Sequence, residues 1–148
     1  MTSKISLERP HALGRVLNFA AGASTTMCQN LLEPHGLTLA QWVILSALWR
    51  RDELLVTEIA EYVGRNVPAV SRIIDRMVER GLIERKTSQT DRRAVKVSLT
   101  EKGRALDYLA AFYKDVNEKL LEGLSDAESS ALFDLLLRVD ANARRYQK

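Results

Sequence analysis

Cysteine and histidine are scarce in this sequence, and each shortage excludes a class of protein. A single cysteine, Cys28, cannot form a disulfide within the chain, so a disulfide-stapled fold is excluded and a reducing cytoplasm is expected. With only two histidines, His11 and His35, and no acidic cluster at ligand spacing, we expect no metal site and no cofactor. Neither a phosphate-binding glycine loop nor a Gly-x-Ser-x-Gly motif occurs, so the sequence predicts no enzyme.

Long apolar runs are also missing. No stretch approaches the roughly 18 consecutive apolar residues that a membrane span needs. Charges interrupt the first fifteen residues where a signal peptide requires an apolar region. We therefore expect neither membrane insertion nor export. The 3 prolines and 7 glycines are few for 148 residues, which favours helix, and 46% hydrophobic residues suffice for a core. A single domain over residues 1–148 is predicted.

The net charge of +3 is unevenly distributed. Between Arg65 and Arg104 there are eleven basic and five acidic residues, a net of +6. The rest of the chain carries eleven basic and fourteen acidic residues, a net of −3. A basic middle between acidic flanks predicts that the middle meets a polyanion and that the flanks have another role.

Hydrophobic spacing and capping residues divide the chain into elements in the order α-α-α-α-β-β-α-α. Thr38 with Gln41, and Ser125 with Glu128, form capping boxes. Single N-caps are expected at Thr57, Asn66 and Thr100. The fold class is therefore mostly α with a small β-hairpin. The predicted helices are 12–33, 39–50, 58–63, 67–80, 101–122 and 126–146, and the strands are 82–88 and 94–99.

The segment 58–80 reads as a helix-turn-helix. The second helix carries one apolar stripe, and its opposite face has small residues and arginines, which suits entry into a DNA major groove. An ordinary solvated surface helix is the alternative. The helix start also directs a positive dipole and free N–H groups toward a phosphate. The expected DNA-contacting residues here are Arg65, Asn66, Pro68, Ala69, Ser71, Arg72 and Arg76.

The hairpin after this helix makes the unit a winged helix-turn-helix. Its loop, "QTDRR", places Arg92 and Arg93 at the tip, where an arginine can enter a narrow minor groove of negative potential. Asp91 is expected to pair with Arg93 or cap the turn, and Lys86 adds a cation on the first strand. A simple solvated turn is the alternative.

The segment "TDRRAVKVSLTEKG" resembles the wing signature of the MarR family of bacterial transcription regulators. The matching residues are Asp91, Arg93, Leu99, Thr100 and Gly103. "VSRIIDRMVERGLIER" and "LTLAQWVILSAL" resemble the family's recognition helix with its first wing strand, and its second helix. The resemblance implies a dimeric, cytoplasmic DNA-binding protein that often represses nearby genes and is often released by an aromatic or phenolic compound or an oxidant. Pro68 and Ala69 depart from the family, which often carries Ser or Thr there.

The terminal helices carry apolar stripes and little basic charge. We expect residues 38–100 to form the winged-helix lobe, and residues 10–36 and 101–148 to form a helical dimerisation lobe. A stripe of this kind can equally be intrachain core. A twofold dimer would present two recognition helices to half-sites about 34 Å apart on a pseudo-palindromic operator.

An effector site is the least defined expectation. Trp42, Trp49, Phe19, Tyr108 and Phe112 could line a cleft, although each also suits a core. His11 and Arg15 could bind the carboxylate of a small aromatic acid, and Cys28 could sense oxidants if it is accessible.

Two further functions remain open at this stage. A non-specific architectural DNA-binding protein would show a steep salt dependence without sequence preference. A protein-docking module would use the same surface without DNA.

Overall fold

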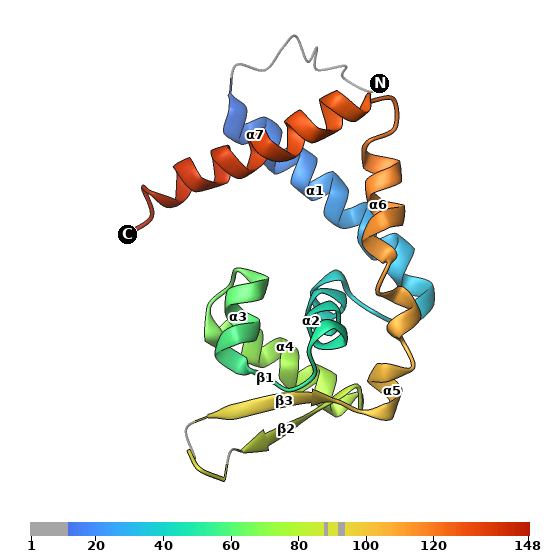
Figure 1. Ribbon diagram of the computed structural model, residues 1–148, viewed down its shortest axis with the longest axis vertical. Coiled ribbons are helices and arrows are strands. Elements are labelled where there is room, and N and C mark those ends of the chain that lie inside the picture. Colours follow the sequence, from blue (N-terminus) through green and yellow to red (C-terminus); the bar gives the residue numbers. More distant parts are fainter. Residues whose placement is uncertain (1–11, 88, 92–93) are drawn as a thin grey trace, which may run out of the picture. The chain divides into compact units, whose positions relative to one another are not determined.

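The computed structural model describes residues 12–87, 89–91 and 94–148. Most of these residues are helical, with one small antiparallel sheet, which confirms the predicted fold class (Figure 1). The chain divides into two compact units, one reaching Ala110 and the other covering Ala111–Lys148. The elements of the first unit are α1 (Leu13–Leu32), η1 (Glu33–His35), α2 (Leu39–Arg50), β1 (Leu54–Leu55), α3 (Val56–Val63), α4 (Val67–Glu79), β2 (Ile83–Thr87), β3 (Val95–Leu99), α5 (Glu101–Arg104) and η2 (Asp107–Leu109).

The core of the first unit lies where α2, α3 and α4 pack together beside the sheet. Figure 1 shows these three helices gathered next to the paired strands β2 and β3. The predicted stripe of α4 faces this core, with Val70, Ile74 and Met77 fully buried. Side chains from every neighbouring element complete it, namely Leu45 and Leu48 of α2, Ile59 of α3, Ile83 of β2 and Val97 of β3.

The sheet has the strand order β1-β3-β2. Strands β2 and β3 form the expected hairpin, with Ile83 opposite Leu99 and Arg85 opposite Val97. The third strand, β1, was not predicted. It consists of two residues, Leu54 and Leu55, which pair with Val97 and Lys96 of β3. A strand this short has no periodicity of its own, so only its distant partner reveals it.

Both predicted capping boxes are present. Thr38 and Gln41 exchange hydrogen bonds of 3.2 Å in both directions at the start of α2. Ser125 and Glu128 also exchange hydrogen bonds, of 2.8 and 3.1 Å, at the start of α7 (Asp126–Arg144). The predicted cap at Thr57 is wrong, because α3 begins at Val56, two residues before the predicted start, and Leu55 is the N-cap. The Leu55 N–H donates to Glu58 Oε2 at 2.8 Å.

The predicted helix 101–122 is interrupted. Its place is taken by α5, η2 and α6 (Phe112–Leu120). Two tryptophans of α2 give the physical reason. Trp49 Nε1 donates to the Gly103 carbonyl at 3.0 Å, and Trp42 Nε1 donates to the Leu109 carbonyl at 2.9 Å. A continuous helix would use those carbonyls for its own i+4 amides, so the indoles favour the breaks that follow.

The second unit contains α6 and α7. No residue of α7 is buried, although the helix carries four leucines and a phenylalanine. Across the described ranges, every helix is too short or too polar to cross a bilayer.

Gly103 sits where α5 meets the turn that follows α4. A Cβ atom added to Gly103 would lie 2.1 Å from the backbone carbonyl oxygen of Leu82 and 3.1 Å from the Leu99 side chain. The same Leu82 carbonyl accepts the Thr100 N–H at 3.2 Å, so it cannot move away freely. Only glycine fits this contact, which gives a structural reason for the glycine of the wing signature.

We expect Gly103→Ala to destabilise the protein by about 2–4 kcal/mol, because the overlap is with backbone rather than a flexible side chain. Urea denaturation followed by circular dichroism measures this change. Glu101→Ala, an exposed change in the same short helix, serves as the control and should cost less than about 0.5 kcal/mol. Equal stability of the two variants would contradict the close contact.

Candidate nucleic-acid interface

Helix α4 presents the side of the molecule that we consider for nucleic acid. Its apolar stripe is turned inward, so Arg72, Asp75 and Arg76 are exposed, whereas Ala69 and Ser71 are half-buried. Arg65 is exposed just before the helix. Within the described ranges, Arg65, Arg72 and Arg76 make no hydrogen bond or ion pair through their side chains. Three exposed guanidinium groups without protein partners are available to an anion.

The start of α4 offers fewer amide donors than expected. Asn66 caps the helix as predicted, since its Oδ1 accepts the Ala69 N–H at 2.9 Å. The Val70 N–H donates to the Asn66 carbonyl, and Pro68 has no N–H. Of the first-turn amides, only that of Val67 has no acceptor among the described residues. The arginine side chains, more than the helix end, therefore supply the positive charge.

The hydroxyl of Ser71 is already engaged. Arg85 of β2 donates to Ser71 Oγ at 2.9 Å and to its backbone carbonyl at 3.1 Å, and it forms an ion pair of 2.8 Å with Asp75. Ser71 keeps its own O–H proton to donate. The Ser71 hydroxyl is thus held in place by Arg85, and it can still donate its proton to DNA or accept one further hydrogen bond.

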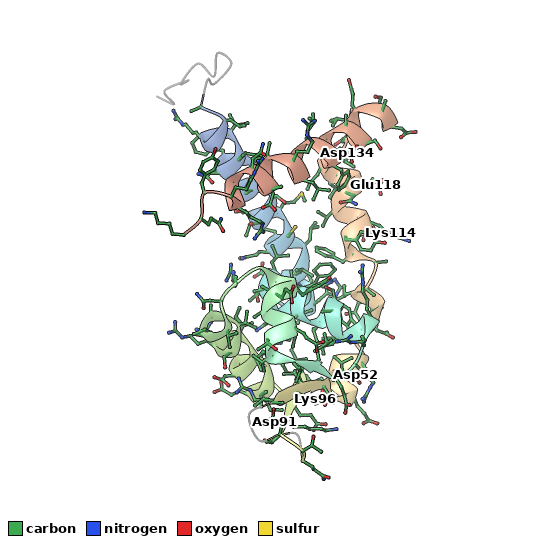
Figure 2. All side chains as sticks on the ribbon, turned by 60° about the vertical axis from the view of Figure 1, so that its left-hand side comes forward. Asp52, Asp91, Lys96, Lys114, Glu118 and Asp134 are labelled. Carbon is green, nitrogen blue, oxygen red and sulfur yellow. The ribbon has the colours of Figure 1, made fainter. Side chains whose placement is uncertain are left out.

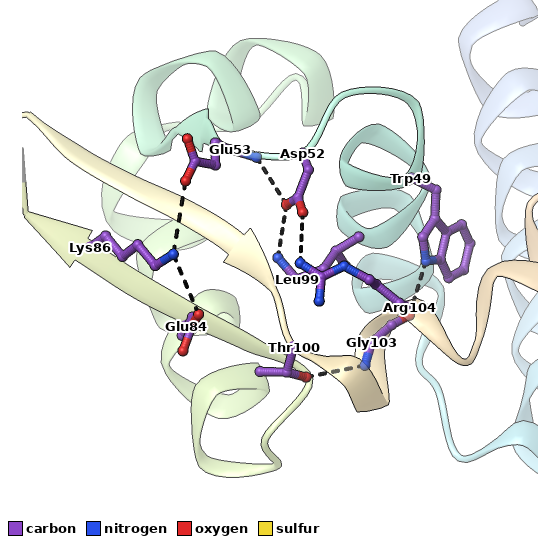
Figure 3. A network of polar contacts seen from close by, with 9 residues as sticks. All are labelled: Trp49, Asp52, Glu53, Glu84, Lys86, Leu99, Thr100, Gly103 and Arg104. Atoms are coloured by element: carbon purple, nitrogen blue, oxygen red, sulfur yellow. Dashed lines mark hydrogen bonds and ion pairs between the residues drawn. The ribbon is translucent and has the colours of Figure 1, made fainter.

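The outward face of the hairpin carries two lysines in opposed positions, Lys86 of β2 and Lys96 of β3. Like charges opposite each other destabilise a strand pair. Two carboxylates offset this, because Lys86 Nζ lies 3.7 Å from Glu84 and 3.9 Å from Glu53 (Figure 3). Figure 2 shows Lys96 and Asp91 on the hairpin, and Asp91 is exposed. Arg92 and Arg93, the predicted tip cations, lie outside the described residues.

Asp52 ties the base of the wing to the helices (Figure 3). Its Oδ1 accepts the N–H groups of Leu99 and Glu53 at 2.9 Å, and its Oδ2 faces the Arg104 guanidinium at 3.2 Å. Burial acts to raise the pKa of Asp52, but the two N–H groups and Arg104 outweigh it and lower the pKa below its ordinary value. The charged carboxylate is therefore the form that holds β3.

The last turn of α4 is fixed by residues from the wing signature. Thr100 Oγ1 donates to the Gly81 carbonyl at 2.6 Å and accepts the Gly103 N–H at 3.1 Å. Lys102 Nζ donates to the Arg80 carbonyl at 2.9 Å. Arg80 in turn donates to the Gln41 side chain at 2.9 Å. These contacts connect the end of α4 to α5 and to the start of α2.

The residues considered for an effector each have contacts of their own in the described ranges. Trp42 and Trp49 are half-buried and bond to backbone carbonyls, while the Arg15 guanidinium lies 5.2 Å from the Phe19 ring centre on α1. Tyr108 bonds to His35 at 2.9 Å. Phe112, in the second unit, is buried, and His11 lies outside the described residues. The effector site stays a prediction.

Cys28 is 5% exposed on α1. Burial limits the access that an oxidant needs. The structure thus supplies no support for sensing by Cys28, which stays a prediction.

Sequence reasoning missed the contacts that organise this surface, those of Asp52, Arg85 and Arg80. A signal existed for Arg85, because strand alternation places it on the same face as the buried Ile83, where an arginine needs a partner. No local pattern points to Asp52, whose partner Leu99 is 47 residues away.

We expect the stabilisation by Asp52 to depend on pH. Because its folded pKa is lowered, the contribution is present above the ordinary pKa of an aspartate, about 3.9, and is lost as the pH falls through the folded value. Asp52 is partly exposed, so Asp52→Asn should cost only about 1 kcal/mol at pH 7. Urea denaturation at pH 7 and near pH 3 checks this, with the difference from wild type shrinking in acid. A constant difference would contradict a role for the charge.

Comparison with known proteins gives two kinds of match. Residues 37–95 match the sequence model of the MarR family. A mutant of MarR from E. coli complexed with operator DNA has a TM-score of 0.79 and 26% identity, with 86% of this chain and 92% of that chain covered. BpsR of Bordetella bronchiseptica, whose DNA binding is regulated by 6-hydroxynicotinic acid, has a TM-score of 0.77 and 27% identity, covering 86% and 97%.

A probable transcriptional regulator from Pseudomonas aeruginosa is similar to the same extent. Its TM-score is 0.79 and its identity 28%, with 87% of this chain and 97% of that chain covered. The family's sequence model covers the helix-turn-helix and the first wing strand, and the solved structures share the fold along most of the chain. Together these matches show that residues 37–95 are similar in sequence to the MarR family, and that the chain shares the fold of MarR-type transcription regulators along most of its length.

Proposed function

We propose that this protein is a dimeric, sequence-selective DNA-binding repressor. The observation that carries the proposal is the set of three exposed arginines, Arg65, Arg72 and Arg76, on and beside a helix whose opposite face is buried. A helix of this kind fits a major groove, where a guanidinium can donate two hydrogen bonds to guanine. The similar E. coli MarR mutant is complexed with operator DNA, which supports DNA binding by this fold.

DNA binding is tested by gel shift on the DNA beside the protein's own gene. Arg72→Ala or Arg76→Ala is expected to weaken binding by about 1–3 kcal/mol if the arginine reads a base, with specificity relaxed at that base pair. If the arginine contacts a phosphate instead, its loss should weaken binding equally on all sequences. The slope of the logarithm of the binding constant against the logarithm of the salt concentration should then become shallower by about one.

Arg50→Ala is the matched control, because it removes one exposed cation from α2 without breaking an ion pair among the described residues. An unrelated duplex that competes as well as the target would favour the non-specific architectural function. No shift at low salt would contradict DNA binding altogether.

Dimerisation through the terminal helices is the second part of the proposal. On α7, Leu135 is 53% exposed and Leu137 is 67% exposed, and no residue of the helix is buried within the chain. On α1, Leu13 and Phe19 are more than half exposed. Apolar surface of this extent favours burial against another subunit. We assign residues 10–36 and 101–148 to this lobe, and 38–100 to the winged helix.

We expect Leu135→Lys to convert the dimer to monomers, because it places a charge among apolar side chains that would otherwise gain about 1.5–3 kcal/mol each on burial. Analytical ultracentrifugation measures the shift. Asp134→Lys, at an exposed position on the helix face opposite Leu132 and Leu136, should leave the dimer intact. A wild-type protein that is monomeric at micromolar concentration would contradict this part.

The third part of the proposal is that a small molecule or an oxidant releases the protein from DNA. BpsR is regulated by 6-hydroxynicotinic acid, a small aromatic acid. A ligand of this class, a phenol or an oxidant would act here by binding better to the geometry that does not fit DNA. Repeating the gel shift with aromatic acids, phenols and peroxides tests for release.

A further inference from the structure

Arg85 joins the wing to the outer face of α4 through one nitrogen atom. Its Nη2 lies 2.8 Å from Asp75 Oδ1, 2.9 Å from Ser71 Oγ and 3.1 Å from the Ser71 carbonyl oxygen. Within the described part of the chain, these are the side-chain contacts that link β2 to the exposed side of α4. We call this set of contacts the Arg85 clasp.

The clasp acts at a distance from the turn that connects α4 to β2. That turn passes through Gly81, whose φ of 72° is in the left-handed region. Ser71 lies nine residues before Arg80, or about 13 Å along the helix. The base of the hairpin is already held by the Gly103–Leu82 contact, by the Asp52–Leu99 hydrogen bond and by the pairing of β3 with β1. The clasp adds an attachment about two and a half turns before Arg80 on α4. It therefore fixes the angle between the outer part of β2 and the outer face of that helix.

The clasp also neutralises an acid on the surface that meets DNA. Asp75 follows Arg72 by three residues and precedes Arg76 by one, and its side chain is 60% exposed. An unpaired carboxylate there would repel the phosphates that the neighbouring arginines attract. Pairing with Arg85 removes that repulsion without adding a free cation.

We propose that Arg85 is a positioning residue for DNA recognition, which holds the wing and α4 as one rigid reading surface and masks Asp75. This inference rests on the proposed DNA-binding function. An ordinary surface ion pair would differ in its effect, since it contributes about 0–1 kcal/mol to stability and leaves selectivity unchanged.

The first experiment measures dissociation constants for the target duplex and for an unrelated duplex by fluorescence anisotropy. Arg85→Ala should lower the ratio of the two affinities at least tenfold, because a pivoting wing loses the geometry that selects a site. Arg50→Ala, which removes the same charge, should lower both affinities by a similar, smaller factor. A ratio that falls no further in Arg85→Ala than in Arg50→Ala would overturn the proposal.

Asp75→Asn separates the two effects of the clasp. In the double variant Arg85→Ala/Asp75→Asn the repulsive carboxylate is gone but the wing is still released. We expect it to bind the target more tightly than Arg85→Ala, yet at least threefold more weakly than wild type. Wild-type affinity in the double variant would mean that Arg85 only masks Asp75, and would overturn the positioning role.

A measurement without DNA keeps the clasp testable if the proposed function fails. In ¹⁵N relaxation, the wing amides of β2 and β3 should have order parameters near the rigid value of about 0.85 in wild type and near 0.6 in Arg85→Ala. Arg50→Ala should match wild type. If wild type shows no preference between duplexes, the proposed function fails, and the relaxation result alone then decides whether Arg85 fixes the wing. Order parameters near 0.85 for the wing amides of Arg85→Ala would contradict the claim that Arg85 fixes the wing.

Discussion

The close approach of Gly103 to the Leu82 carbonyl determines where the wing starts. Because no side chain separates the two backbones, Thr100 can bond to both Leu82 and Gly81, and Lys102 can bond to Arg80. The end of α4 and the end of β3 are therefore one joint. Everything that this surface does toward another molecule depends on that joint, since it sets the starting point of both the helix and the hairpin.

The charge of the middle segment serves two purposes. Five of these cations are bound to partners within the chain, and each has a bond to another segment, namely Arg80, Arg85, Lys86, Lys102 and Arg104. Arg65, Arg72 and Arg76 have no such partner in the described ranges and remain exposed. A net charge counted from the sequence adds the two groups together. The structure separates them by partner. Arg85, Lys86 and Arg104 are paired with carboxylates. Arg80 and Lys102 bond to uncharged oxygens and keep their charge for the long-range attraction of a polyanion, as the exposed arginines do.

Features that depend on near neighbours were predictable from the sequence. The capping boxes at Thr38 and Ser125 and the apolar stripe of α4 follow from spacings of three or four residues, and the structure confirms them. Features that depend on distant partners were not. The two-residue strand β1 exists only because β3 pairs with it, and its presence moves the start of α3 away from Thr57. The helix expected after Thr100 is broken where indoles from α2 take its carbonyls. The exposed arginines of the site were predicted, whereas Asp52 and Arg85 were not. Their partners in other elements, Leu99 and Asp75, lie ten or more residues away.

Both tryptophans of the chain bond to the segment that leaves the wing, at Gly103 and at Leu109. Indole emission depends on the polarity and hydrogen bonding of the ring. A displacement of this segment relative to α2 would break one or both bonds and shift the emission spectrum. The protein therefore contains its own optical reporter beside the joint that carries the wing, and its motion can be followed in solution without attaching a dye.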